Sequence, residues 1–180
     1  MLKPTRYFDR VSSIDPLLDL KNYGYRCVLL DIDNTLRSRA DGLVPSDVRR
    51  WLGSLSSYGV KACLLSNNWH NNVFELAENL DLPIVAKALK PLPFAFFRAC
   101  KLLGCSRKET VMIGDQLSTD VWGANAIGMS SYLVVPLAKE DLKHTLLVRK
   151  AERAILGSYP VESLRHSANE AQAQSLSNSL

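Results

Sequence analysis

The sequence lacks any apolar run long enough to cross a bilayer. A spanning helix needs roughly 18 or more uninterrupted apolar residues, and the apolar runs here are short and end in polar or charged residues. The first ten residues, MLKPTRYFDR, contain a proline and several charges rather than a leader-like apolar segment. These absences predict a cytoplasmic protein, and they leave peripheral contact with the inner face of the membrane open.

Cysteine is scarce and shows no metal-binding pattern. The chain has four cysteines, namely Cys27, Cys63, Cys100 and Cys105. No two of them form a CxxC pair and no histidine lies at zinc-ligand spacing, which argues against a thiolate metal site. We therefore expect four small, buried, free thiols in a reducing compartment.

The excess of charge of one sign is also modest. The chain has 22 Lys and Arg and 18 Asp and Glu, which gives a formal net charge of +4. The basic residues are scattered along the chain, so we expect no nucleic-acid partner. A mild basic balance suits a phosphorylated substrate or an anionic membrane surface. With 47% hydrophobic residues in a chain of 180, composition and length are those of one globular domain.

What the sequence does contain is a series of short apolar runs separated by segments of helical period. The runs RCVLLD, VKACLLS, LPIVA, TVMIGD and SYLVVP cover 26–31, 60–66, 82–86, 110–115 and 131–136. They lack polar alternation, which is typical of parallel strands buried on both faces. Helical patterns lie between them at 45–59, 72–80 and 93–104. The alternation predicts an α/β fold, a Rossmann-like parallel sheet with helices on both faces.

Polar side chains follow these strands at their ends. Asp31, Ser66 and Asp115 end three of the strands, and Lys90 follows a fourth. Open α/β sheets bind ligands beyond the carboxyl ends of their strands, so we expect these side chains to converge. The pair Asp31 and Asp33 alone often only caps a helix or forms an Asx turn. Three carboxylates beside a lysine, however, repel one another unless a hard cation such as Mg²⁺ joins them and draws in a phosphate.

Four short motifs occur in order at the predicted strand ends: DIDNT at 31–35, LLSNN at 64–68, KP at 90–91 and GDQLSTD at 114–120. Together they resemble the motifs of the haloacid dehalogenase (HAD) superfamily of aspartate-nucleophile phosphatases. More narrowly, LLDIDNTL and IGDQLSTDVWGANAIG resemble the YqeG-type branch of subclass IIIA, which is similar to phosphatidylglycerophosphate phosphatases. That branch places a basic residue after the asparagine-rich motif, where this sequence has Trp69 and His70.

The resemblance implies a role for each carboxylate. Asp31 would be the nucleophile and would form an aspartyl-phosphate intermediate. Asp33 would protonate the leaving alcohol and then activate water, while its backbone carbonyl binds the metal. Asp115 would complete a Mg²⁺ site with Asp31 and Asp33, and Asp120 would be an auxiliary group beside it.

The resemblance also implies a set of phosphate-binding residues. Ser66 and the backbone N–H of Asn67 would hold phosphate oxygens, and Lys90 would neutralise the transferring group. Thr35 would be an auxiliary residue that hydrogen-bonds within its turn. Asn34, beside it, is expected to be a turn former rather than a catalytic group.

Along the chain we expect an N-terminal strap at 1–24, a HAD-like phosphatase domain at 25–158 and a disordered tail at 159–180. No sizeable cap domain fits between the motifs, so the crevice should be open. An open crevice favours a substrate whose bulk lies outside it, and the resemblance points to phosphatidylglycerophosphate. Two alternatives remain: a phosphatase of soluble sugar or nucleotide phosphates, and a non-catalytic binding module with the same fold.

Both ends of the chain contain a candidate membrane-contacting segment. Residues 3–11 place Lys3, Arg6 and Arg10 among aromatic and apolar residues, a pattern compatible with lying on an anionic bilayer. Residues 139–156 have a helical period and a basic face. The alternative for either segment is packing against the sheet, with its charges in water.

Overall fold

The computed structural model describes residues 2–137, which form a parallel sheet of six strands in the order β1-β6-β5-β2-β3-β4. The strands are β1 Arg6–Phe8, β2 Cys27–Leu30, β3 Lys61–Leu65, β4 Ile84–Val85, β5 Thr110–Gly114 and β6 Ser130–Val134. The helices are α1 Ser46–Leu55, α2 Asn71–Asn79, α3 Pro93–Leu103 and α4 Trp122–Ala126. Shorter helical turns are 3₁₀ at Val11–Ser13, Lys21–Tyr23 and Ser56–Tyr58, and π at Pro16–Leu20 and Leu117–Val121.

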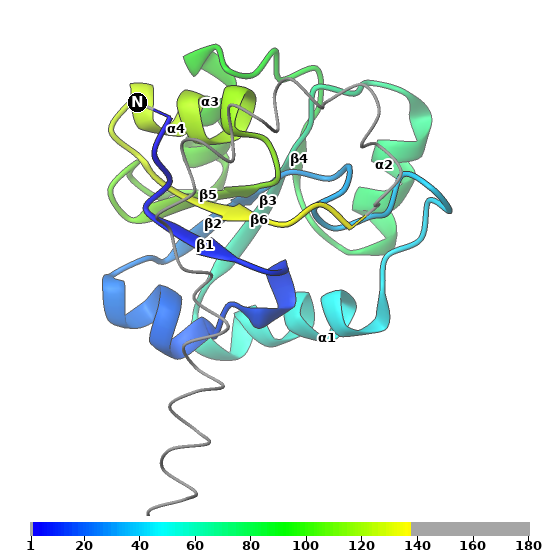
Figure 1. The fold of residues 1–180 in the computed structure, drawn as a ribbon, viewed down its shortest axis with the longest axis horizontal. Coiled ribbons are helices and arrows are strands. Elements are labelled where there is room, and N and C mark those ends of the chain that lie inside the picture. The colour runs from blue at the N-terminus through cyan, green and yellow to red at the C-terminus, as the bar shows by residue number, and fades with distance from the viewer. Residues whose placement is uncertain (1, 138–180) are drawn as a thin grey trace, which may run out of the picture.

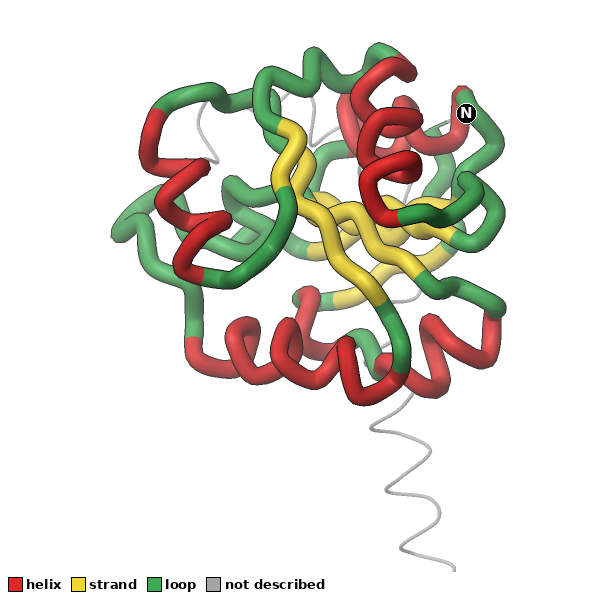
Figure 2. The backbone as a smooth tube through the Cα atoms, turned by 180° about the vertical axis from the view of Figure 1, so that it is seen from behind, coloured by secondary structure: helices red, strands yellow, loops and turns green. Residues whose placement is uncertain are grey.

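The strands sort their side chains alternately into two cores, because successive residues of a strand point to opposite faces. On β2, Val28 and Leu30 join a core with α1, α2 and the N-terminal segment. Cys27 and Leu29 join a second core with α3 and α4. Figure 1 shows α3 and α4 on one side of the sheet and α1 on the other, and Figure 2 shows the same layers from behind. The predicted α/β sheet with helices on both faces is confirmed.

The strand order reverses at β2, which lies between β5 and β3. At such a switch point the connections leave in opposite directions and open a crevice beyond the carboxyl ends of the strands. Asp31 is the first residue after β2. The topology therefore places the predicted nucleophile at the crevice.

The N-terminal segment is an integral part of the sheet. β1 pairs in parallel with β6, with Arg6 opposite Tyr132 and Phe8 opposite Val134. Phe8 and Val11 are fully buried, and Arg6 donates to Asp19 at 2.6 Å. The expectation that this stretch could lie on a bilayer is wrong, because its apolar side chains belong to the core.

Two of the cysteines differ from the prediction. Cys27 at the start of β2 and Cys105 after α3 form a disulfide, with their Cα atoms 6.5 Å apart. Cys63 and Cys100 are free and buried, as expected. The pair could not be predicted from the sequence because the two residues are 78 positions apart. They meet only because α3 returns the chain to the amino-terminal edge of the sheet.

No sizeable cap interrupts the described part of the chain. The connections from β2 to β3 and from β3 to β5 hold only α1, α2, β4 and α3 with their turns. No helix in residues 2–137 is long and apolar enough to span a membrane. The helix predicted at 139–156 and the tail predicted at 159–180 lie outside the described residues, as does the end of the domain predicted at 25–158.

Candidate active site

Asp31 is a buried carboxylate with one oxygen held by a lysine and the other without a hydrogen-bond donor in the described part of the chain. Its side chain follows β2 and is 7% exposed. Oδ1 accepts a hydrogen bond from Lys90 Nζ at 2.5 Å. Oδ2 is buried, and no donor among residues 2–137 reaches it. The Lys90 contact holds the carboxylate in one orientation, as a nucleophile requires.

Lys90 is positioned by the loop after β3. The side-chain amide of Asn67 bonds both backbone groups of Lys90: its Oδ1 accepts from the N–H at 2.7 Å, and its Nδ2 donates to the carbonyl at 3.2 Å. The Lys90–Pro91 peptide bond is cis. Lys90 Nζ also donates to Asp120 Oδ1 at 2.7 Å. The sequence suggested a phosphate-binding role for the Asn67 N–H but not this clamp by its side chain.

Three carboxylates meet at the ends of β2 and β5. Asp31, Asp115 and Asp120 each offer an oxygen atom, and these atoms lie within 4.8 Å of one another. Asp120 approaches so closely because Gly114 has no side chain: a Cβ built at Gly114 would lie 2.7 Å from the Asp120 Cβ. The Gln116 N–H donates to Asp120 Oδ2 at 3.1 Å. Asp120, predicted as an auxiliary group, thus belongs to the acidic cluster itself.

This acidic cluster fits a divalent cation. Asp31 Oδ2 and Asp115 Oδ1 are both buried and lack hydrogen-bond donors among the described residues. An unsatisfied buried carboxylate oxygen is costly, and a hard cation with oxygen ligands would satisfy both at once. Asp31 and Asp115 would hold such an ion, and Asp120 lies beside them as a further candidate ligand.

The same arrangement shifts the pKa values of the cluster. Burial is the main cause that raises the pKa of Asp31 to about 6; Lys90 opposes this shift, and Asp120 and Asp33 add to it. Burial likewise raises the pKa of Asp115 well above its usual value, with the charges of Asp31 and Asp120 acting in the same direction. Burial disfavours the charge on Lys90, but Asp120 and Asp31 outweigh it and raise the pKa of Lys90.

Asp33 lies two residues after Asp31, and its carboxylate is paired with a cation. Its Oδ1 accepts from Arg37 at 2.6 Å, and the Arg37 residue is only 8% exposed. The pair fixes one oxygen of Asp33 and leaves the second for proton transfer. Arg37 was not identified from the sequence, although its position four residues after Asp33 is compatible with a pair inside one tight turn.

The turn itself is formed by Asn34 rather than by Thr35. Asn34 has φ 65°, its N–H donates to the Arg37 carbonyl at 2.7 Å, and its Oδ1 accepts from the Arg39 N–H at 3.3 Å. The predicted hydrogen bond of Thr35 within the turn is wrong. Its Oγ1 is buried without a partner among residues 2–137, because backbone bonds and the Asn34 side chain already close the turn.

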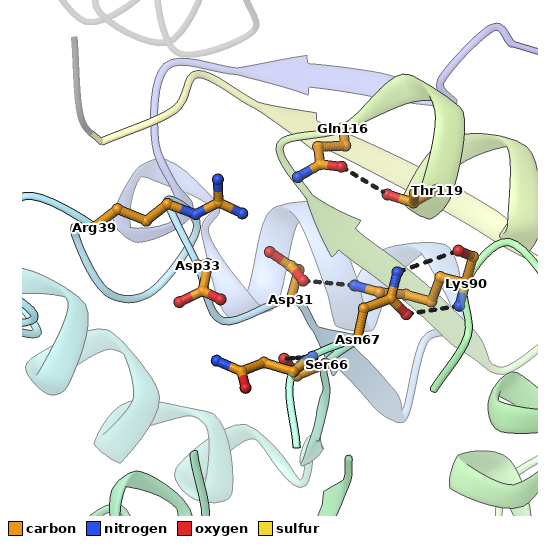
Figure 3. A pocket seen from close by; sticks show the side chains of 9 residues that line it. Asp31, Asp33, Arg39, Ser66, Asn67, Lys90, Gln116 and Thr119 are labelled. Atoms are coloured by element: carbon orange, nitrogen blue, oxygen red, sulfur yellow. Dashed lines mark hydrogen bonds and ion pairs between the residues drawn. The ribbon is translucent and has the colours of Figure 1, made fainter. Parts of the chain in front are cut away.

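A cleft of about 160 Å³ opens above these groups. Ser66, 2% exposed, lies on its floor, and the Ser66 Oγ accepts from the Asn68 N–H at 3.1 Å, which leaves the hydroxyl hydrogen to donate. Figure 3 shows Arg39 reaching over Asp33 into the cleft from the loop after β2. The remaining lining residues are Asp31, Asn67, Asn68, Lys90, Gln116 and Thr119.

Three lining residues were not singled out from the sequence. Gln116 and Thr119 lie inside the GDQLSTD motif, and Thr119 Oγ1 donates to Gln116 Oε1 at 3.2 Å. Arg39 follows the DIDNT motif in a loop with no helical or strand period. Its side chain brings a basic group to the cleft from a loop other than the asparagine-rich one.

A known phosphatase resembles this chain in sequence over most of its length. Probable phosphatase YqeG from Bacillus subtilis (strain 168) is 34% identical over 155 residues, which cover 86% of this chain and 90% of that protein. Residues 88–136 match the HAD-hydrolase-like family. The chain belongs to the HAD-like phosphatases. N-acylneuraminate-9-phosphatase from Homo sapiens is 33% identical over 64 residues, covering 32% of this HAD-like chain and 26% of that enzyme.

Solved structures show the same fold at low sequence identity. An uncharacterized protein from Listeria monocytogenes serotype 4b superposes with a TM-score of 0.51 and 17% identity, covering 69% of this chain and 98% of that chain. The cobalt-bound deoxy-D-mannose-octulosonate 8-phosphate phosphatase from Haemophilus influenzae gives a TM-score of 0.50 and 15% identity. The match covers 76% of this chain and 90% of that chain. This HAD-like phosphatase therefore has the fold of the superfamily with no large cap in its described residues.

Proposed function

We propose that this phosphatase hydrolyses a phosphomonoester through a phosphorylated Asp31, with Mg²⁺ as its cofactor. The observation that carries the proposal is the asymmetry of Asp31, whose Oδ1 is held by Lys90 while its buried Oδ2 has no donor among the described residues. When bound, Mg²⁺ would neutralise the acidic cluster and polarise a phosphate oxygen. Asp31 and Asp115, with the backbone carbonyl of Asp33, would hold the ion, and the geometry adds Asp120 as a further candidate ligand.

In the first step an oxygen of Asp31 attacks phosphorus and the bond from phosphorus to the leaving alkoxide breaks. Asp33, oriented by Arg37, donates its proton to that alkoxide. Ser66, the Asn67 N–H and Lys90 bind the phosphoryl oxygens as charge develops. The products of this step are a free alcohol and aspartyl phosphate.

In the second step Asp33, now ionised, accepts a proton from water, and the resulting hydroxide attacks phosphorus. The bond between phosphorus and the Asp31 oxygen breaks, which releases inorganic phosphate and restores the carboxylate. Asp33 ends the cycle protonated, ready for the next leaving group. Two easier steps thus replace one direct hydrolysis.

We further propose a lipid phosphomonoester, phosphatidylglycerophosphate, as the natural substrate. The cleft is small, polar and without a cap in the described chain, so it has room for a phosphate and its nearest atoms while the bulk stays outside. The chemistry of the site does not require a lipid, so soluble sugar or nucleotide phosphates remain the competing substrates.

The test compares substrates with the purified full chain in the presence of Mg²⁺. Phosphate release from phosphatidylglycerophosphate in mixed micelles is measured beside a panel of soluble phosphomonoesters. A higher kcat/KM for the lipid is expected, and a higher value for any soluble ester would favour a soluble sugar or nucleotide phosphate as the natural substrate. Acid quench of a single turnover, followed by peptide mass analysis, should locate phosphate on Asp31; phosphate on another residue, or on none, would refute the intermediate.

A further inference from the structure

Helix α3 exposes an unusual outer surface. Its inner stripe, which includes Phe96, Ala99 and Leu103, is buried in the core beside the sheet. Its outer stripe follows the same helical spacing and combines large apolar side chains with two basic ones. We call this outer stripe the α3 face, made of Phe94, Phe97, Arg98, Lys101 and Leu102. Phe94 is 77% exposed, Leu102 55% and Phe97 47%.

Further exposed apolar residues lie close to the α3 face in the sequence and on the neighbouring helix. Leu89 and Leu92, which flank the catalytic Lys90 loop, are 55% and 49% exposed. On the neighbouring α4, Trp122 is 41% exposed. α4 packs tightly on the start of α3, since a Cβ at Gly123 would lie 2.6 Å from the Phe96 ring. Large exposed apolar side chains gathered on and beside one helix are typical of an interaction site.

Helix α3 and the residues that flank it in the sequence contain charges of one sign. Residues 82–108 contain six Lys and Arg and no Asp or Glu. Because the whole chain carries a net charge of only +4, its remaining residues are net acidic. Residues 121–129 of the α4 segment also contain no acidic residue. Arg98 and Lys101 are exposed between the apolar side chains of the α3 face. The helices on the opposite side differ, because α1 and α2 carry Asp47, Glu75 and Glu78.

We propose that the α3 face docks on a bilayer that contains anionic phospholipid. Phe94, Phe97 and Leu102 would enter the headgroup boundary, as the apolar stripe of an interfacial helix does. Arg98 and Lys101 would bind lipid phosphates, each adding an attraction that salt weakens. The pairing of aromatic and exclusively basic side chains fits a lipid surface of negative charge.

A second copy of this chain fits the same surface less well. A two-fold symmetric contact places each patch against itself, so the basic residues of the α3 face would oppose one another without acidic partners. Docking on lipid, by contrast, neutralises them. It also places Leu89 and Leu92, and hence the cleft, at the headgroup level. In this respect the inference rests on the proposed lipid substrate, whereas the docking itself requires no catalysis.

Co-sedimentation of the full chain with vesicles tests the docking directly. Vesicles of phosphatidylcholine alone are compared with vesicles that also contain phosphatidylglycerol, at low and high salt. We expect binding to the anionic vesicles only, weakened by salt. The double variants Phe94→Ser/Phe97→Ser and Arg98→Gln/Lys101→Gln should each lower the partition coefficient by about tenfold or more.

Matched controls use exposed residues on the other side of the sheet. Leu18→Ser and Arg50→Gln remove an exposed leucine and an exposed arginine from the α1 side, and binding should stay at the wild-type level. Hydrolysis of p-nitrophenyl phosphate should also be unchanged in the α3-face variants, which shows that they fold and separates docking from the proposed chemistry. If the wild type hydrolyses neither phosphatidylglycerophosphate nor any soluble phosphomonoester while vesicle binding follows the prediction, the proposed function fails and the docking stands.

Three results would overturn the proposal. The first is equal recovery of the wild type in the supernatant with both kinds of vesicle. The second is unchanged binding by the α3-face variants. The third is a wild-type dimer in solution, measured by light scattering, that dissociates in Phe94→Ser/Phe97→Ser and shows no vesicle binding, since this would assign the α3 face to a second copy.

Discussion

The two faces of the sheet are built differently. On the α1 side, the N-terminal segment, α1 and α2 form one continuous core that polar contacts close: Trp51 Nε1 donates to the Ile14 carbonyl at 2.6 Å, and the Tyr132 hydroxyl donates to the Asp19 carbonyl at 2.6 Å. On the α3 side the core is smaller, and the loops into its helices deliver Lys90 and Asp120 to the cluster. One side mainly stabilises the fold, and the other carries the charges of the site.

The difference has a physical cause. Buried carboxylates oppose folding, because desolvation and mutual repulsion penalise their charged forms. The α3 side compensates with Lys90, which pairs with two carboxylates at once, and through Asn67, which holds that lysine in place. The α1 side has no such cluster among residues 2–137. Substitutions on the two sides should therefore separate activity from stability.

The largest effect is expected for Asp31→Asn, at the boundary of the two faces. The amide keeps the shape but cannot attack phosphorus, so kcat should fall by roughly 10⁴-fold or more. Removing a desolvated charge near Asp115 and Asp120 should raise the thermal midpoint by a few degrees in EDTA. Phosphate release and thermal melts check both parts. Substantial turnover by this variant would remove Asp31 from the role of nucleophile.

Lys90→Met should damage both properties. It leaves Asp31 and Asp120 buried without their cation, so activity should be lost and the free energy of unfolding should fall by about 3–5 kcal/mol. The matched control is Lys101→Met on the same side, an exposed lysine outside the cleft. Denaturant titration measures the difference. Equal stability of the two variants would show that Lys90 does not compensate the cluster.

Phe8→Ala and Phe96→Ala compare the two faces directly, since both rings are fully buried. Each should lower the free energy of unfolding by about 3–5 kcal/mol. Only Phe96→Ala should also lower kcat, because Phe96 packs on Gly123 beside the loop that carries Lys90. Kinetics at a temperature where both variants stay folded provide the measurement. Equal loss of kcat in both would break the division between the faces.

The pH dependence of stability should reveal the buried carboxylate in metal-free protein. The pKa of Asp31 is raised to about 6 from its usual 3.8, so the folded state binds a proton more tightly than the unfolded state. The free energy of unfolding should therefore fall as the pH rises from about 4 to about 6, and it should recover as the pH is lowered again. In EDTA, the gain in thermal midpoint from Asp31→Asn should be larger at about pH 7.5 than at about pH 5. An equal gain at both pH values would contradict this assignment.

The smallest effect is expected from a pair of glycines. Gly53→Ala in α1 meets no atom within 4 Å and should raise the free energy of unfolding by about 0.5–1 kcal/mol, with activity unchanged. Gly114→Ala would collide with Asp120, so it should instead lower activity by displacing that carboxylate. Melts and initial rates distinguish the two. Wild-type activity in Gly114→Ala would show that the position of Asp120 is not critical.

Much of the site could be predicted because it depends on local pattern. Asp31, Ser66 and Asp115 each follow an apolar run, and parallel strands bring such ends to one edge of a sheet. The contacts between side chains were harder to predict from the sequence. The clamp of Asn67 on Lys90 joins residues 23 positions apart, and the choice of Arg37 as the partner of Asp33 depends on the left-handed turn at Asn34.

The sequence by itself determined the order of β2 to β6 and of α1 to α3, the two-sided burial of the sheet and the identity of the acidic and basic groups at its edge. These features follow from local periodicity and residue type, whereas β1 and α4 were not predicted. The tertiary structure decided which distant segments meet. β1 joins β6 at the far end of the chain, Cys27 pairs with Cys105, and Asp120 enters the acidic cluster above Gly114. It also decided that apolar and basic side chains of α3 face outward. The composition of the whole chain averages over both faces of the sheet, whereas packing assigns each side chain to one face.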